Sequence, residues 1–571
     1  MQLLSRQRLT HARAWAALAA AAMLLGILAG ALAARDARGA SGQKNVVFIL
    51  TDDMTTSELS AMPNVQSLIA AQGTTFSEAY VSFPLCCPSR ATLMSGEYMH
   101  NHGVHGNLSP NGSWTKFIPH ESSAIPVRLH DDGYYNVHIG KYMNGYPTND
   151  VTLPIPKDGT LPVPVGWDEW YGKVSEDALY FDYQLIEKTG PSSTPHITFY
   201  GNQPSDYQTD VFADRAVNFV SDSAVSKQPF WLNLWFNSPH GPFEPAPRDL
   251  YRYAGAPLPQ LAAFNEKDIR DKPKWLRREA RYPLSKERIK VIDNERRRQE
   301  EQLASVDDAV GRLIQTLKDK GILDDTYIIF SSDNGFFRGE HRIASGKYLP
   351  YDPASRVPLL IRGPGIPAGG VRNELVWNGD IPQTILQIAS GSQDDSLDGR
   401  SLLPYAQNPA LRSTRPVLLE GDTGPGGTGS EAAQSSAART REARVRVAGK
   451  RGVNDLEQET DAIKSAANTD RAPAYRSIRT DRYEYTVYAN GQIELYDMKR
   501  DPAQLDSLAA DPRYRYVRRW LYEQLIPLST CAGASCRVEL GPDPWPLKKK
   551  ALRPKRKKKP GRGPKQPAPK P

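Results

Sequence analysis

Short apolar runs that end in polar residues recur along the 571-residue chain. Four of them read NVVFILTDD, GYYNVHIGKY, PFWLNLWFNSPH and TYIIFSSDNG, and they are rich in the β-branched and aromatic residues typical of strands. Between such runs lie stretches with apolar residues three and four positions apart, such as EEQLASVDDAVGRLIQTLKDKGI, which predict helices. Strands that alternate with helices predict an α/β fold, with a large, mostly parallel sheet sandwiched by helices.

Polar side chains at the ends of these four runs are the first candidates for a functional site. They are Asp52 and Asp53, Lys141, His240, and Asp333 with Asn334. Ligands of open α/β sheets bind beyond the carboxyl ends of the strands. If the four strands are parallel neighbours, these side chains meet at one edge of the sheet. This is the central prediction from the sequence.

The pattern changes towards the carboxyl terminus. VPLLIRGPGI predicts another strand and DIPQTILQIAS another helix, so the α/β domain is expected over residues 43–415. Residues 416–475 are mostly rich in Gly, Ala, Ser, Thr and charge, and they predict a variable surface insertion. Residues 476–540 alternate around Asn490-Gly491, a strong hairpin signal, and predict a smaller antiparallel subdomain.

Residues 1–42 resemble a targeting segment. A basic stretch precedes an apolar run from Ala14 to Ala34, and small and polar residues follow, as in a secretory signal peptide. The run is also long enough to span a bilayer, so a signal anchor is the alternative. Both predict a secreted or cell-surface protein in an oxidising compartment, where Cys531 and Cys536 favour a local disulfide over two free thiols.

The net charge of +8 comes from the end of the chain. Residues 548–571 hold 12 Lys or Arg and no acid, so the preceding residues carry 8 − 12 = −4. Residues 541–571 have too few apolar side chains to fold and predict a disordered basic tail. The tail is either a solvated extension or a segment that binds an anionic polymer or a membrane surface. Because the chain is expected to be exported, no specific nucleic-acid partner is expected.

The strand-end residues include the ligands that a hard cation prefers. Asp52, Asp53, Asp333 and Asn334 offer oxygen and no sulfur, which suits Ca²⁺ or Mg²⁺ rather than zinc. One acidic pair after a strand more often caps a turn or helix. Two such pairs favour a metal site, because close carboxylates repel one another unless a cation lies between them.

Four cationic candidates complete the set. They are Arg90, Lys141, His240 and Lys347. Taken singly, Lys347 could be a solvated loop residue and His240 a turn cap. Around a divalent ion they form a site for a tetrahedral anion, because positive groups stabilise its oxygens while the metal activates a nucleophile. The combination predicts a hydrolase of sulfate or phosphate esters.

The stretch PLCCPSRATLMSG, residues 84–96, resembles the sulfatase signature, in which Cys-x-Pro-Ser-Arg precedes a small hydroxyl residue and glycine. Cys86 is in register with Arg90, and Cys87 fills the variable position. The resemblance extends to FILTDDM, GKYMNGY, NSPHGPF, SSDNGFFRGEHR, GKYLPYDPASRVPLLIRGPG and RYEYTVYANGQIELYDMKRDP. It therefore spans nearly everything between the signal and the tail. The doubled cysteine and GKYMN more closely resemble the N-acetylglucosamine-6-sulfatase branch, which acts on sulfated amino sugars of glycosaminoglycans.

The resemblance implies an exported sulfatase with an alkaline phosphatase-like fold and a sulfated carbohydrate substrate. The family oxidises its cysteine to formylglycine, which implies a formylglycine-generating enzyme as a maturation partner. The implied ligands of Ca²⁺, or of Mg²⁺, are Asp52, Asp53, Asp333, Asn334 and the hydrated formylglycine at Cys86. Arg90 and Lys141 would hold the aldehyde hydrate, and Lys347 and His240 the sulfate, with His240 as the acid for the leaving alcohol. Arylsulfatase-type members carry a histidine where this chain has Met143. The resemblance therefore assigns no residue as the base that deprotonates the second hydroxyl of the aldehyde hydrate.

The sequence leaves two other interpretations of the function open. One is a phosphonate or phosphate-ester hydrolase of the same superfamily, which cleavage of model esters would distinguish. The other is a non-catalytic glycan-binding protein, which predicts an unmodified Cys86. The nearby His100, His102 and His105 could bind zinc, but a structural role is favoured because no fourth ligand has suitable spacing.

Overall fold

The computed structural model describes residues 42–147, 161–174, 180–222, 228–255, 261–422 and 472–545. The predictions for the signal segment, for most of the insertion and for the basic tail from residue 546 onward lie outside these residues. In the parts of the chain described, no helix has both the length and the apolar character needed to cross a membrane.

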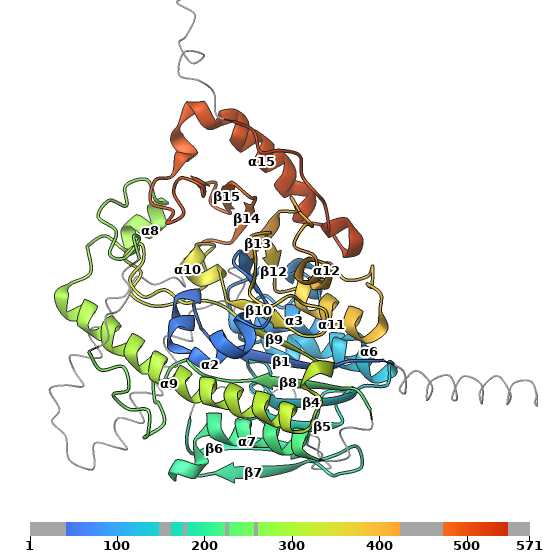
Figure 1. Cartoon of the computed structure of the whole chain (residues 1–571). Coiled ribbons are helices and arrows are strands. Elements are labelled where there is room, and N and C mark those ends of the chain that lie inside the picture. Colours follow the sequence, from blue (N-terminus) through green and yellow to red (C-terminus); the bar gives the residue numbers. More distant parts are fainter. Residues whose placement is uncertain are drawn as a thin grey trace, which may run out of the picture.

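A ten-stranded sheet forms the centre of the molecule (Figure 1). Its order is β11-β2-β10-β9-β1-β8-β4-β5-β6-β7. The strands are β1 (Asn45–Thr51), β2 (Thr74–Phe76), β4 (Tyr135–Gly140), β5 (Glu169–Lys173), β6 (Tyr183–Lys188), β7 (His196–Tyr200), β8 (Phe230–Trp235), β9 (Thr326–Ser332), β10 (Leu359–Arg362) and β11 (Gly370–Arg372). Neighbours from β9 to β5 are all parallel, whereas β10 and β6 are antiparallel to the strands beside them. The predicted mostly parallel sheet is confirmed, and its antiparallel edges were not predicted.

The four apolar runs identified in the sequence are adjacent strands, in the order β9-β1-β8-β4. Thr51 of β1 lies beside Ser332 of β9, and Leu50 lies beside Trp235 of β8. Trp235 in turn lies beside Gly140 of β4. All three pairings are parallel, so the carboxyl ends of the four strands meet at one edge, as predicted.

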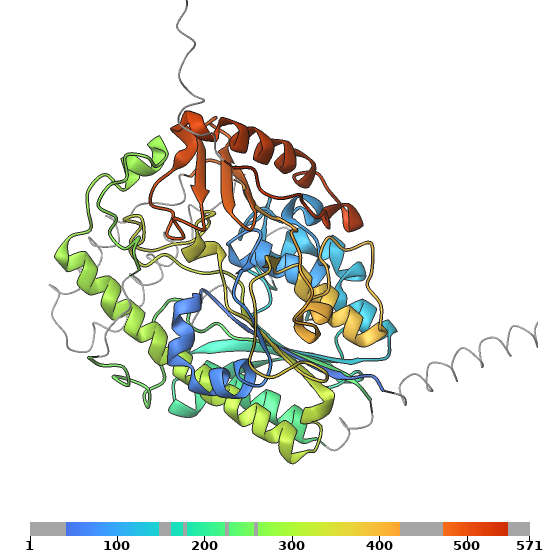
Figure 2. The ribbon, with the colours of Figure 1, turned by 45° about the horizontal axis from the view of Figure 1, so that its top comes forward.

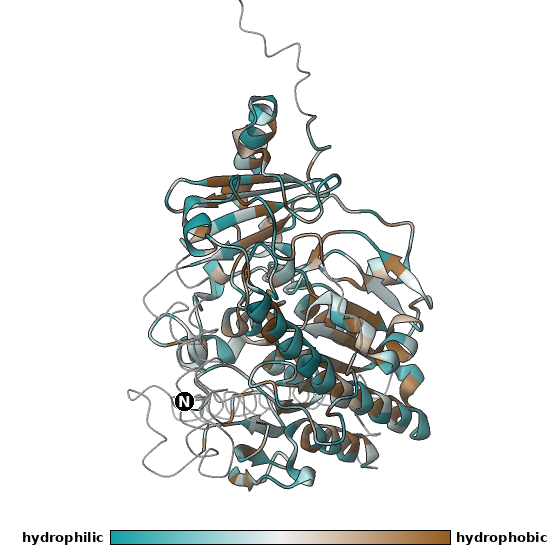
Figure 3. Ribbon diagram, turned by 90° about the vertical axis from the view of Figure 1, so that its left-hand side faces the viewer, coloured by the Kyte–Doolittle hydropathy of each residue, from teal (hydrophilic) through white to brown (hydrophobic). Residues whose placement is uncertain are grey.

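Helices cover both faces of this sheet (Figures 1 and 2). One face packs against α7 (Gln208–Ser221) and α9 (Lys286–Asp319), and the other against α3 (Cys86–Ser95), α6 (Ile125–Asp131) and α11 (Asp380–Ser390). Each face has its own apolar core. In Figure 3 the strands are largely brown, whereas α9 carries hydrophilic teal over much of its length.

Helix α9 begins earlier than its apolar pattern predicts. Its first turns, from Lys286, are dominated by Arg, Lys, Glu and Asp, so only its second half shows the three-and-four spacing. Ser285 caps the helix, since its side chain accepts a hydrogen bond from Arg288 N.

The shorter elements are η1 (Thr56–Ala61), α2 (Pro63–Val65), η2 (Gln66–Ala70), β3 (Ala79–Tyr80), α4 (Met99–His102), α5 (Ser113–Phe117), η3 (Ile118–Ser123), η4 (Pro204–Asp206), α8 (Lys274–Glu279), η6 (Leu323–Asp325), α10 (Asp352–Ser355), β12 (Val376–Trp377) and α12 (Leu403–Gln407).

A four-stranded antiparallel sheet, capped by a helix, follows the α/β domain. Its strands are β13 (Val417–Gly421), β14 (Tyr475–Arg479), β15 (Tyr483–Tyr488) and β16 (Ile493–Asp497), and α15 (Arg515–Leu528) covers it, with the short helices η8 (Leu508–Ala510), η9 (Pro512–Tyr514) and η10 (Gly533–Cys536) nearby. The predicted hairpin around Asn490-Gly491 joins β15 to β16, and Gly491 has a φ of 79°. One boundary needs correction. Strand β13 lies within residues 416–475, which we assigned to the insertion, but its apolar residues pair with β14 and are buried.

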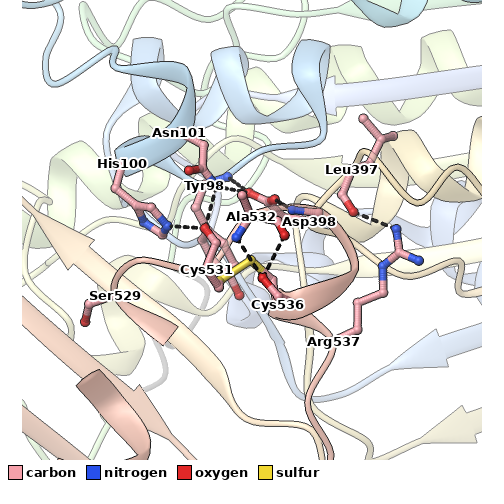
Figure 4. The surroundings of a disulfide bond; sticks show 12 residues. Tyr98, His100, Asn101, Leu397, Asp398, Ser529, Cys531, Ala532, Cys536 and Arg537 are labelled. Atoms are coloured by element: carbon pink, nitrogen blue, oxygen red, sulfur yellow. Dashed lines mark hydrogen bonds between the residues drawn. A yellow bond between two sulfur atoms is a disulfide. The ribbon is translucent and has the colours of Figure 1, made fainter. Parts of the chain in front are cut away.

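The subdomain shares an apolar core with the α/β domain, which includes Tyr98 and Trp377 from the larger unit and Tyr475 and Leu521 from the smaller one. The predicted disulfide joins Cys531 to Cys536. Figure 4 shows that the short loop it closes lies against α4 and the segment around Asp398. The Asp398 carboxylate accepts hydrogen bonds from Gly533 N and Tyr98 N, at 2.6 and 2.7 Å. The two units are thus joined by apolar and polar contacts.

Candidate active site

Two acidic pairs form one buried cluster at the carboxyl edge of the sheet. Asp52 and Asp53 directly follow β1, and Asp333 and Asn334 directly follow β9; none is more than 2% exposed. The Asp53 backbone N–H donates to Asp333 Oδ1 at 3.3 Å, and Asn334 Nδ2 donates to Asp53 Oδ1 at 2.5 Å. Asp53 has a left-handed backbone, with a φ of 69°, a strained conformation that often marks functional residues.

Cys86 is the first residue of α3 and faces this cluster. Its Sγ lies 2.7 Å from Lys347 Nζ and 3.5 Å from Asp52 Oδ1, and it is fully buried. Candidate ligand atoms of Asp52, Asp53, Cys86 and His240 all lie within 4.8 Å of one another. The cysteine that the signature places in register therefore lies among the acidic residues.

Cys87 has different surroundings. Its side chain packs in the apolar core on one face of the sheet. Its backbone N–H donates to Asn107 Oδ1 at 2.8 Å, which fixes the first turn of α3. The two neighbouring cysteines are thus separated into one that faces the polar cluster and one that packs in the core.

Arg90 bridges the two acidic pairs from the next turn of α3. Its Nε donates to Asp333 Oδ2 at 2.8 Å and its Nη2 to Asp52 Oδ2 at 3.1 Å, and all three side chains are fully buried. Its Nη1 donates to the Lys141 carbonyl at 2.6 Å. The guanidinium also lies over the Trp235 ring, 5.2 Å from the centroid, which adds a cation–π contact.

Lys141 follows β4 and forms an ion pair with Asp52 Oδ2. The turn into Lys141 depends on Gly140, whose φ is 115°. A Cβ at position 140 would lie only 1.9 Å from the Trp235 carbonyl oxygen, so a larger residue does not fit there. The close approach of β4 and β8 thereby sets the position of the lysine.

Lys347 and His240 lie on the other side of the cluster. Lys347 Nζ donates to Asp53 Oδ1 at 2.7 Å, and His240 Nε2 lies 3.6 Å from Asp53 Oδ2. His240 Nδ1 donates to the Gly241 carbonyl at 2.6 Å, which leaves Nε2 directed at the cluster. The His240 side chain is 23% exposed, more than those of Lys141 (12%) and Lys347 (6%), so the group opens to solvent nearest His240.

The surroundings raise the pKa of Cys86 and lower the pKa of Asp52. Burial raises the pKa of the Cys86 thiol well above its ordinary value, and the Asp52 charge raises it further, so a thiol here stays protonated. Burial alone would also raise the pKa of Asp52, but Lys141, His240, Arg90 and Lys347 together lower it far below its usual range. Asp52 therefore stays ionised, while an unmodified Cys86 is a poor nucleophile.

The donor set fits a hard divalent cation. Carboxylate oxygens of Asp52 and Asp53 lie close together beside Cys86, and the Asn334 side chain is bonded to Asp53. Ca²⁺ and Mg²⁺ prefer oxygen ligands of this kind. Asn334 Oδ1 is buried and has no hydrogen-bond partner among the described residues, which is costly unless something else satisfies it. Asp333 reaches the same group through Arg90 and Asp53 N.

The three nearby histidines have separate partners. His102 Nε2 lies 3.1 Å from Thr92 Oγ1, and His100 Nδ1 lies 3.1 Å from Glu420. His105 pairs with Asp422 at 2.9 Å. Each of the three rings thus has its own partner, and the structural role favoured from the sequence stays a prediction.

Some residues that shape the site left no signal in the sequence. Trp235 lies under Arg90 and is fully buried. Tyr180, also fully buried, donates its hydroxyl to the His240 carbonyl at 2.7 Å. Trp235 lies inside a run that was predicted only as a strand, and Tyr180 lies outside the quoted motifs, so only the three-dimensional structure reveals their part in the site.

This fold, together with the buried group of acidic and cationic side chains, defines a hydrolase of sulfate or phosphate esters. Residues 44–392 match the family model described as Sulfatase, and the chain belongs to the sulfatase family. It is a sulfuric ester hydrolase with an alkaline phosphatase-like fold, and members of the family generally depend on formylglycine and a metal ion.

Among its relatives, the human N-acetylglucosamine-6-sulfatase is 30% identical over 533 residues, which cover 90% of each chain. The N-acetylglucosamine-6-O-sulfatase of Bacteroides thetaiotaomicron is 27% identical, over 64% of this chain and 71% of its own. An extracellular sulfatase homologue from Caenorhabditis elegans is 35% identical, but this chain spans only about half (49%) of its length.

Two solved structures show the same fold. One, determined with its substrate D-glucosamine-2-N,6-O-disulfate, has a TM-score of 0.63 at 22% identity and covers 85% of this chain and 97% of its own. The other, the phosphonate monoester hydrolase of Agrobacterium radiobacter, has a TM-score of 0.60 at 22% identity, over 85% of this chain and 95% of its own.

Proposed function

We propose that the chain removes a sulfate ester from a carbohydrate, such as a 6-sulfated N-acetylglucosamine, with a formylglycine made from Cys86 and a bound Ca²⁺. The observation that carries the proposal is the position of Cys86, whose Sγ lies between Lys347 Nζ and Asp52 Oδ1. The sugar specificity is supported by the names of the human and Bacteroides relatives. Mg²⁺ would fit the same oxygen donors.

Asp52, Asp53, Asp333 and Asn334 would hold the cation. A hydrated aldehyde at position 86 would supply two hydroxyl groups on one carbon, and a divalent cation would lower the pKa of the one it binds. Arg90 is fixed by two carboxylates, so it would orient that group rather than move during the reaction.

Lys347 and His240 would bind the sulfate. The Lys347 ammonium already lies 2.7 Å from Cys86 Sγ, where it would stabilise charge on the sulfate oxygens. His240 Nε2 faces the same point because Nδ1 is held by Gly241 O. From there it would donate the proton that the departing alcohol needs when the sulfur–oxygen bond breaks.

We further propose that the chain is exported to the cell surface or beyond, and that it is matured by a formylglycine-generating enzyme. Export is supported by the signal-like order of residues 1–42 and by the extracellular homologues from Caenorhabditis elegans and Drosophila melanogaster. The disulfide between Cys531 and Cys536 agrees with an oxidising compartment.

Mass spectrometry of the peptide that contains residues 84–96 tests the proposal. We expect an aldehyde in place of one thiol, at Cys86 and not at Cys87, and faster turnover of sulfate esters than of phosphate or phosphonate esters. Phosphate or phosphonate turnover alone would favour the hydrolase related to the Agrobacterium protein. An unmodified Cys86 in a protein that binds but does not cleave sulfated sugars would favour a glycan-binding role.

A further inference from the structure

A cavity, here called the flanking pocket, lies beside the proposed catalytic group. Its volume is about 240 Å³, which suits a single sugar ring. Its walls include Thr55, Arg296, Phe336, Arg338, Asp352 and Gln504, whereas Cys86, Lys141, His240 and Lys347 do not line it. It is therefore separate from the space in which the sulfate would lie.

The chain itself keeps this pocket close to the catalytic group. Thr55 is two residues beyond Asp53, and Phe336 is two residues beyond Asn334. Two residues of extended chain span at most about 7 Å. The wall of the pocket thus lies about one sugar unit from the proposed metal ligands.

The chemistry of the walls suits a sugar. A sugar ring has an apolar C–H face and an edge of hydroxyl groups, so it needs a flat apolar surface together with hydrogen-bond donors and acceptors. Phe336 is half-buried and supplies the surface. Asp352 Oδ1 is buried and has no hydrogen-bond partner among the described residues, so it supplies an acceptor.

The charge of the pocket is nearly balanced, which also favours hydroxyl groups over a strongly anionic ligand. Arg338 pairs with Glu58 at 2.8 Å, and Arg356 pairs with Asp352 through its other oxygen at 3.6 Å. A paired arginine still has N–H groups that can donate to a ligand, and a paired carboxylate still has lone pairs that can accept from one.

The C-terminal subdomain closes one side of the pocket. Gln504 Oε1 accepts a hydrogen bond from Asp352 N at 2.9 Å, and Gln504 Nε2 donates to Glu484 Oε1 at 3.0 Å. Gln504 therefore fixes Asp352 from the subdomain side. At the rim, Leu261 is 43% exposed, so the pocket is open to a chain that enters from solvent.

We infer that the flanking pocket binds the sugar unit next to the one that carries the ester, so that the enzyme prefers an oligosaccharide to a single sulfated sugar. The inference rests on the proposed function. It assigns to the C-terminal subdomain a part in substrate choice, through Gln504 and the loop around it.

The test compares kcat/KM for N-acetylglucosamine 6-sulfate with kcat/KM for disaccharides that contain this sugar at either end. The ratio of disaccharide to monosaccharide should exceed one in the wild type. Phe336→Ala and Asp352→Asn should each lower it about fivefold, mainly by raising KM for the disaccharide. Phe336→Tyr keeps the ring and should keep the ratio.

Phe199→Ala is the matched control, because Phe199 is 64% exposed on the edge strand β7. If Phe336→Ala does not fold, the isosteric Asp352→Asn decides. An unchanged ratio in pocket variants with the wild-type melting temperature would overturn the inference.

Calorimetry with the unsulfated disaccharides separates this inference from the proposed function. Binding that both pocket variants weaken would support the pocket even if the wild type cleaved no sulfated sugar. Absence of binding to the wild type, together with a ratio no greater than one, would overturn the pocket while leaving the sulfatase reaction intact.

Discussion

The two adjacent cysteines differ in what their side chains meet. Cys86 faces Lys347 and Asp52, whereas Cys87 packs in the apolar core. Burial raises the pKa of the Cys86 thiol well above its ordinary value. A protonated thiol neither attacks well nor binds a hard cation well, which is a physical reason for converting it to a group with hydroxyl oxygens.

Replacing each cysteine separately checks this difference. Cys86→Ala should lower kcat by at least about 10³-fold, because it removes the proposed nucleophile. Cys87→Ala should keep kcat within severalfold, with a modest loss of stability from the missing sulfur in the core. Steady-state turnover of a sulfate ester and thermal unfolding measure the two effects. Equal losses of activity would contradict the assignment of Cys86.

Removing divalent cations should abolish turnover, and adding Ca²⁺ should restore it. The reason is that carboxylate oxygens of Asp52 and Asp53 lie close together, and that Asn334 Oδ1 has no hydrogen-bond partner among the described residues. A second readout does not need activity. Ca²⁺ should raise the melting temperature of the wild type but not of Asp53→Ala, since a ligand stabilises only the state that binds it. If a chelator changed neither turnover nor the melting temperature, the acidic cluster would not be a metal site.

Arg90 also makes a prediction for stability. It holds two buried carboxylates through separate nitrogens, and lysine has no such planar fork. Arg90→Lys should therefore cost about 3 kcal/mol of unfolding free energy, besides most of the activity. Urea unfolding of the variant and of Arg519→Lys, whose side chain is 78% exposed, gives the comparison. Equal stability of the two variants would show that the bridge contributes little.

At the scale of elements, the sequence predicts best where one periodicity dominates. Strands β1, β4, β8 and β9 are buried along nearly their whole length, as expected for strands covered on both faces, and the polar residues that follow them form the candidate site. Helix α11 was predicted over Asp380–Ser390, where the structure has it.

The failures at this scale also have physical causes. The first turns of α9 are too charged to show a helical apolar pattern, and they are held by ion pairs such as Arg296 with Glu300. Strand β13 is five residues long and lies beside a polar stretch, so composition averaged over a window hid it. The antiparallel direction of β10 follows from pairing with β9, which no local pattern records.

Helix α4 and strand β13 are joined by a titratable contact. The His100 ring lies between Glu420, at 3.1 Å from Nδ1, and the Cys531 carbonyl, at 2.9 Å from Nε2. Burial would lower the pKa of His100, but the hydrogen bond and charge of Glu420, the Cys531 carbonyl and Asp398 outweigh burial and raise it.

Because the folded-state pKa of His100 is raised, its contribution to stability is complete below its ordinary value of 6.5 and is lost as pH rises through the folded-state pKa. His100→Gln should thus lower the unfolding free energy by about 1.5–3 kcal/mol at pH 5.5, and by less at alkaline pH. Melting temperatures across this range measure the difference. A deficit for His100→Gln that stays constant across this pH range would refute the titration.

At the scale of the whole molecule, the α/β domain and the C-terminal subdomain share one apolar core and the contacts of the disulfide loop. Together they place the subdomain's Gln504 loop beside the flanking pocket. A combined variant, Cys531→Ser with Cys536→Ser, should lose about 2 kcal/mol of unfolding free energy, the loop-entropy value for so short a ring. Calorimetry should still show one transition, because the shared core remains; two separated transitions would show that the units fold independently.

The positive net charge of the chain comes from its basic tail and not from the domain that holds the candidate active site. Residues 548–571 hold twelve Lys or Arg and no acid, and the residues before them carry −4. Removing residues 548–571 should therefore leave kcat/KM for a small soluble sulfate ester within about twofold, because such an ester needs only the site at the sheet edge. The same truncation should weaken retention on an immobilised anionic polysaccharide in dilute buffer, and the difference should vanish near 1 M salt, where charges are screened within about 3 Å. A large loss of small-ester turnover would instead make the tail part of the catalytic unit, and unchanged retention would leave it a solvated extension.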